Sequence, residues 1–157
     1  MRMEALWTSA VAVIGTLLGG VVTHVFQRRA AKENEHFSRT ESLRQERIAA
    51  YSAFAGALED FRKVQGDRWY RRQEDRNGEP YKEALREGHR HRALARQALF
   101  RVKLLAGDRT LIEAADHAFE ATRNTSGARD EAHRDELFTA SRTAIEVFVE
   151  TAAPSVQ

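Results

Sequence analysis

The sequence predicts an all-α protein in which one N-terminal transmembrane helix is followed by a polar helical stalk and a small antiparallel helical bundle. Residues 5–26 carry no formal charge, and apolar residues after position 43 recur at helical spacing. Pro is rare, and the alternation of polar and apolar residues that is typical of strands is hard to find. We therefore expect three regions, a membrane anchor over 1–26, a stalk or linker over 27–42 and a soluble bundle over 43–157.

The anchor is predicted from the length and the flanks of the uncharged segment. At about 1.5 Å per residue, a helix over 5–26 would extend about 33 Å, which suffices for a hydrocarbon core of about 30 Å. A cleaved signal peptide would have a shorter apolar region and a small-residue cleavage site. Here basic residues follow directly, namely Arg28, Arg29 and Lys32. We expect an uncleaved, single-pass protein of the cell membrane.

The same basic flank predicts the orientation, because Lys and Arg accumulate on the cytoplasmic side of membrane helices. The bundle should then face the cytoplasm. Within the span, Gly15 and Gly19 have the small-xxx-small spacing that allows two membrane helices to approach closely. This spacing is compatible with a homo-oligomer, although small residues are also common in membrane helices that do not associate.

The bundle region contains four predicted helices with short breaks between them. The first helix continues from the stalk and has one apolar face, formed by Leu43, Ile48, Tyr51, Phe54, Leu58 and Phe61. A turn is expected over 73–80, with positive φ at Asn77-Gly78 and Pro80 in the first turn of the next helix. That helix should cover about 81–106, with an apolar face that includes Leu94 and Leu99, and end at Gly107.

The last two helices are predicted over about 110–123 and 129–151. Thr110 and Glu113 have the spacing of a capping box at the start of the third helix. The fourth should bury one face, formed by Leu137, Phe138, Ser141, Ile145, Phe148 and Val149. An antiparallel bundle fits these short helices better than a long parallel coiled coil, because no heptad is sustained.

Charge is divided unevenly along the bundle. Residues 62–109 contain 14 Lys and Arg against 7 Asp and Glu, whereas residues 110–157 contain 4 against 9. One interpretation is that the two halves attract each other within the chain. The other is a phosphate-contacting patch on one helix, made of Lys82, Arg86, Arg90, Arg92 and Arg96. Aromatic and basic residues over 69–72 could add a stacking site for single-stranded nucleic acid at the bundle tip.

No motif predicts an enzyme or a cofactor. The chain has no Cys, no phosphate-binding loop and no nucleophile elbow. A di-iron bundle would need two Glu-x-x-His pairs, and only residues 33–36 match, in the polar stalk. We expect no catalytic, cofactor-binding or metal-binding residues.

The sequence therefore favours a non-enzymatic, membrane-anchored interaction or scaffold module that faces the cytoplasm. Its partners would be the lipid bilayer and another protein or further copies of itself. One alternative is an extracytoplasmic envelope rod of reversed topology, such as a phage-derived protein. The other is a membrane-tethered nucleic-acid-binding module, which the weak basic patch makes the less favoured reading.

Overall fold

The computed structural model of the protein describes the side chains of residues 38–157. The predictions for the membrane span, for Gly15 and Gly19 and for the flanking Arg28, Arg29 and Lys32 lie outside the described residues. The chain is organised into the helices α1 (Arg2–Glu74), α2 (Glu79–Leu105), α3 (Arg109–Asn124) and α4 (Glu131–Ala152), with short 3₁₀ helices η1 (Thr125–Gly127) and η2 (Ala153–Val156).

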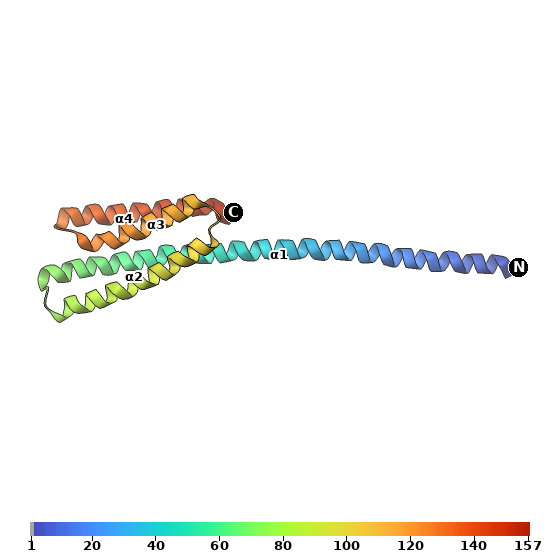
Figure 1. The fold of residues 1–157 in the computed structure, drawn as a ribbon, viewed down its shortest axis with the longest axis horizontal. Coiled ribbons are helices and arrows are strands. Elements are labelled where there is room, and N and C mark those ends of the chain that lie inside the picture. The colour runs from blue at the N-terminus through green and yellow to red at the C-terminus, as the bar shows by residue number, and fades with distance from the viewer. Residues whose placement is uncertain (1) are drawn as a thin grey trace. The chain divides into compact units, whose positions relative to one another are not determined.

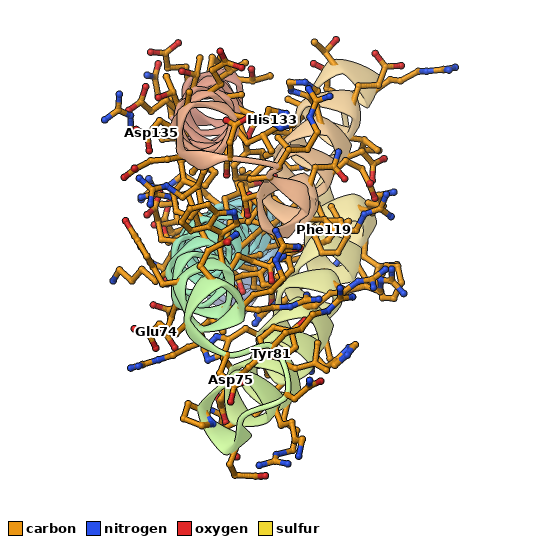
Figure 2. All side chains as sticks on the ribbon, turned by 90° about the vertical axis from the view of Figure 1, so that its left-hand side faces the viewer. Glu74, Asp75, Tyr81, Phe119, His133 and Asp135 are labelled. Atoms are coloured by element: carbon orange, nitrogen blue, oxygen red, sulfur yellow. The ribbon has the colours of Figure 1, made fainter. Side chains whose placement is uncertain are left out.

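The prediction of an all-α fold is confirmed, since the described residues contain helices and no strand. None of the helices is long and apolar enough over its described residues to cross a membrane. Residues 44–157 form one compact unit, which we call the bundle. Within it, successive helices run in alternating directions (Figure 1). In the view along the helices, α2 and α4 lie at opposite corners of the bundle, and α3 packs against both (Figure 2).

The core of the bundle is built from one face of each helix. Phe54 and Phe148 meet edge to face with ring centroids 5.0 Å apart, which joins α1 to α4. Phe61 and Phe119 join α1 to α3 with centroids 6.4 Å apart. These rings are buried together with Leu58, Leu99, Val102, Leu111 and Ile145. Burying apolar side chains of this size stabilises a fold by about 1.5–3 kcal/mol each.

Short polar contacts end the helices, and they differ from the predicted ones. No residue of the described chain has positive φ, and Gly78 precedes α2 with φ of −65°. Instead, the Asp75 carboxylate accepts a hydrogen bond from the Asn77 backbone N–H at 2.9 Å. The capping box at Thr110 was also wrong. Asp108 is the N-cap of α3 and accepts from the Thr110 backbone N–H at 3.0 Å.

The predicted inward faces needed correction at their edges. Leu94 and Val149 were assigned to the core but are exposed, as are Leu43 and Ile48 near the start of the bundle. Small residues take their places on α2, where Ala84, Gly88 and Ala95 are buried. At Gly88 an added Cβ would lie 3.4 Å from the Gln65 side-chain oxygen, so the two helices approach closely there. Small residues of α2 therefore face α1. The apolar pattern alone had predicted that Leu94 would be buried there.

Candidate functional site

The basic patch predicted on α2 divides into two halves with different surroundings. In the first half, acidic residues of the same helix neutralise the basic side chains. Arg86 bridges to Glu79 at 3.1 Å and to Glu83 at closer range, and Lys82 lies 3.6 Å from Glu79. Arg90 pairs with Glu87 at 2.9 Å. These are ion pairs within one exposed helix, which contribute little energy and leave little charge for a ligand.

Protonation preferences in the first half follow from the same contacts. The hydrogen bond from Arg86, aided by the charge of Lys82, lowers the pKa of the Glu79 carboxyl. Hydrogen bonds to Glu83 and Glu79 raise the pKa of the Arg86 guanidinium. Both shifts favour the charged pair, so this half of the patch stays internally neutralised at neutral pH.

The second half of the patch is different, because Arg92 and Arg96 form no ion pair with any described residue. The Arg96 guanidinium instead lies over the Phe119 ring, 5.7 Å from its centroid, where α2 meets α3. An open depression of about 430 Å³ lies here, lined by His89, Arg92, Ala93, Arg96, Gln97 and Phe100. This part of α2 offers positive charge that no described acidic group neutralises.

An apolar stripe accompanies these arginines and was missed in the sequence. Phe100 and Leu104 are 57% and 86% exposed, although both are large and apolar. With Ala93 and Gln97 they are spaced by four, three and four residues, so they share one helix face. At about 3.6 residues per turn, this face lies opposite the one that carries the buried Leu99. The spacing of Phe100 and Leu104 is visible in the sequence. The sequence-based prediction nevertheless considered only the apolar face of this helix that includes Leu99.

The aromatic and basic residues at the far end of α1 are part of the packing. Trp69 is buried, and its indole N–H donates to the Ala128 carbonyl at 3.2 Å. Arg72 donates to the same carbonyl at 2.7 Å. The Arg134 guanidinium lies over the rings of Trp69 and Tyr70, 4.9 and 4.8 Å from their centroids. This cluster ties α1 to the connection between α3 and α4, so the buried Trp69 ring cannot stack on a base.

Asp135 adds a charge to this cluster. Its hydrogen bond and negative charge raise the pKa of the Arg134 guanidinium. Arg134 therefore stays protonated where it lies over the aromatic rings, and its charge is engaged by Asp135 of the same helix. Figure 2 labels Asp135, which lies in the second turn of α4.

Acidic and histidine side chains are the candidate metal ligands of a chain without Cys, and several can be located in the described part of the chain. No group of three or more His, Asp or Glu side chains among the described residues could hold a metal ion. Glu113 pairs with Arg109 at 2.9 Å, and Asp130 caps α4 by accepting from the His133 backbone N–H at 2.8 Å. An apolar groove of about 210 Å³ lies between α1 and α4, with Tyr51 and Phe148 in its wall.

The fold and this surface define a small helical-bundle protein with a mixed basic and apolar face on one outer helix. Residues 48–156 match the family described as KilB plasmid transfer protein, and the chain belongs to that family. The matched residues all lie within the bundle. No curated protein and no solved structure matches the chain.

Proposed function

We propose that the chain is a non-enzymatic interaction module of plasmid transfer, anchored in the cell membrane by residues 5–26 with its bundle in the cytoplasm. The family match over residues 48–156 carries the proposal, because the family is described as a plasmid transfer protein and the matched residues lie within the bundle. Exposed apolar residues on α2 support an interaction role, since large exposed apolar side chains beside charges mark docking surfaces.

The proposed anchoring rests on the uncharged segment and on the excess of positive charge at Arg28, Arg29 and Lys32. It is tested by C-terminal fusions of the full chain to a reporter active only in the cytoplasm and to one active only outside. Membrane fractionation provides the control for both fusions. We expect the cytoplasmic reporter to be active in the membrane fraction. Activity of the external reporter would favour the envelope rod of reversed topology.

The role in transfer is tested in donor cells that carry the plasmid. We expect deletion of the bundle to lower the transfer frequency, and a Phe100→Asp/Leu104→Asp variant to lower it without loss of the protein from the membrane. The control is Lys63→Asp/Arg76→Asp, which also introduces two aspartates, at exposed positions outside α2, and changes the net charge by more than the test variant does. Equal transfer by all chains would contradict the proposal.

A nucleic-acid-binding module is the second candidate, favoured by Arg92 and Arg96 beside the exposed Phe100 ring. Its binding should weaken steeply as salt rises, because phosphate contacts release counterions. Filter binding of a labelled single strand at low ionic strength tests it. Retention that is absent, or that does not depend on salt, would eliminate this candidate.

A further inference from the structure

One outer face of α2 combines exposed apolar residues with unneutralised positive charge. We call it the basic seam, formed by Ala93, Gln97, Phe100 and Leu104 with Arg96 and Arg101 on its two sides. All six residues are exposed. Neither arginine forms an ion pair with a described residue. A helix face with anchors at this spacing is the kind that a second helix covers.

One outer face of α4 has the complementary character. We call it the acidic seam, formed by Glu136, Ala140, Thr143, Val147 and Glu150. Their spacing of four, three, four and three residues keeps them on one face, and all five are exposed. Val147 is 46% exposed, and the glutamates at the two ends pair with no described basic residue. Small residues between the glutamates leave room for larger side chains.

The two seams cannot meet within one copy of the bundle. Helices α2 and α4 lie at opposite corners, with α1 and α3 between them (Figure 2). The basic and acidic halves of the sequence do meet where α2 packs on α3, through Lys103 and Asp116 at 2.7 Å. That contact leaves the outer faces of α2 and α4 uncovered. Any partner of either seam must therefore come from outside the bundle.

We propose that the basic seam of one copy docks on the acidic seam of a second copy, so that the bundles associate head to tail. The proposal rests on the interaction role proposed above and names the partner as the chain itself. Opposite charges on the two seams favour this pairing. Like charges disfavour a symmetric contact between two basic seams, where Arg96 and Arg101 would face their counterparts.

The directions of the helices allow this docking without turning a bundle over. Figure 1 shows that α2 and α4 run the same way, and that both end at the same end of the bundle. At about 1.5 Å per residue, the centres of the two seams lie about 10 and 13 Å from these C-terminal ends. The seams are thus at similar heights. Copies related by a sideways shift would all point in the same direction. This arrangement is compatible with chains that are anchored in the same membrane.

A head-to-tail contact uses two different seams, so each added copy leaves further seams free and the contact builds rows or rings rather than symmetric pairs. One helix against one helix makes a small interface, and small interfaces are weak in dilute solution. Anchoring raises the local concentration of the copies and thereby compensates for weak affinity. The expected behaviour is association that depends on concentration and falls as salt rises.

Charge reversal on either seam provides a reciprocal test. The basic-seam variant is Arg96→Glu/Arg101→Glu, and the acidic-seam variant is Glu136→Lys/Glu150→Lys. All four positions are exposed. Because the chain has no Cys, Gln73→Cys gives a single labelling site for donor and acceptor dyes. Energy transfer between full chains is measured in mild detergent over a dilution series, at low and at high salt, with circular dichroism as the folding control.

We expect each variant alone to associate about tenfold more weakly than the unchanged chain, because the two seams of a contact then carry charge of the same sign. A mixture of the two variants should regain the original transfer efficiency, because both contacts in the mixed row pair opposite charges. The control Lys63→Glu/Arg76→Glu has the same change in charge as the basic-seam variant and should behave like the unchanged chain.

Two results would overturn the proposal. In one, each variant keeps the salt dependence of the unchanged chain. In the other, the mixture regains nothing. If the basic-seam variant loses binding to a labelled single-stranded oligonucleotide while chain association is unaltered, the α2 face belongs to nucleic acid instead. All variants keep the same N-terminal segment. Any association through that segment is therefore equal in all of them and does not affect the comparison. The topology fusions test the proposed function independently of these outcomes.

Discussion

Individual aromatic residues determine how the first and last helices of the bundle are joined. Phe148 is fully buried and packs edge to face against Phe54. Tyr51 approaches the same ring with centroids 6.2 Å apart, and its buried hydroxyl has no hydrogen-bond partner among the described residues. The Phe148 ring of α4 therefore packs against both Tyr51 and Phe54 of α1, beside the apolar groove.

Phe148→Ala should destabilise the bundle by about 3–5 kcal/mol, because it removes a buried ring and leaves a cavity between α1 and α4. Urea denaturation followed by circular dichroism measures the change. Val147→Ala is the control, since the neighbouring Val147 side chain is half exposed and its truncation should cost well under about 1 kcal/mol. Equal losses in the two variants would contradict the described packing.

A buried hydroxyl pair joins α3 to α4. Thr122 donates to the Ala118 carbonyl at 2.8 Å, and its oxygen lies 2.8 Å from that of Ser141. Because the Thr122 hydrogen is already engaged, Ser141 is the donor between the two hydroxyls. Both residues are fully buried. Thr122 therefore takes part in two hydrogen bonds and Ser141 in one, although the two residues share the bond between them.

Thr122→Val should cost about 1–3 kcal/mol, since it leaves the Ser141 donor buried without its acceptor. Ser141→Ala should cost less, about 0.5–1.5 kcal/mol, because Thr122 keeps its bond to Ala118. The double variant should then lose less than the sum of the two, which a double-mutant cycle of denaturation free energies detects. Strict additivity would contradict the coupling of the two hydroxyls, and a larger loss for Ser141→Ala would show that the donor was assigned in the wrong direction.

At the scale of elements, two glycines of α1 experience opposite surroundings. A Cβ at Gly56 would meet nothing within 4 Å, whereas a Cβ at Gly66 would lie 3.0 Å from the Phe138 ring. Gly56 therefore weakens the helix without serving its packing. Gly66 is buried and allows α4 to lie close to α1.

Gly56→Ala should stabilise the bundle by about 0.5–1 kcal/mol, because alanine loses less conformational freedom on forming a helix. Gly66→Ala is the matched control in the same helix, and crowding against Phe138 should remove most or all of that gain. The midpoint of thermal unfolding compares the two variants. A larger gain at Gly66 than at Gly56 would contradict the close approach of α1 and α4.

How far the sequence predicted these elements depended on the kind of contact involved. The breaks before Pro80 and near Gly107 were located from local chemistry, since Pro favours the first turn of a helix and Gly the end of one. The exposure of Leu94 was not predicted, because it depends on a tertiary contact: the face of α2 that carries the small residues packs against α1. The division of the basic patch into a neutralised half and an unneutralised half could have been predicted from the sequence. Glu83 and Glu87 precede Arg86 and Arg90 by three residues, while no acid lies three or four residues before Arg96.

For the whole molecule, the bundle has its own core, and every residue of that core lies after position 49. The family match also begins within the bundle, at residue 48. The buried residues of the described core all come from the bundle itself. Stability and membrane attachment should therefore be separable properties of this chain.

A chain of residues 44–157 alone should fold cooperatively and remain in the supernatant after membranes are sedimented. Its thermal midpoint should match that of the bundle in the full chain, because the buried apolar contacts are the same in both. Residues 1–43 fused to an unrelated fluorescent protein should sediment with the membranes. A truncated bundle that is unfolded would show that the preceding segment supplies part of the core. A fusion that stays soluble would remove the basis for a membrane anchor, and the bundle would then act without tethering.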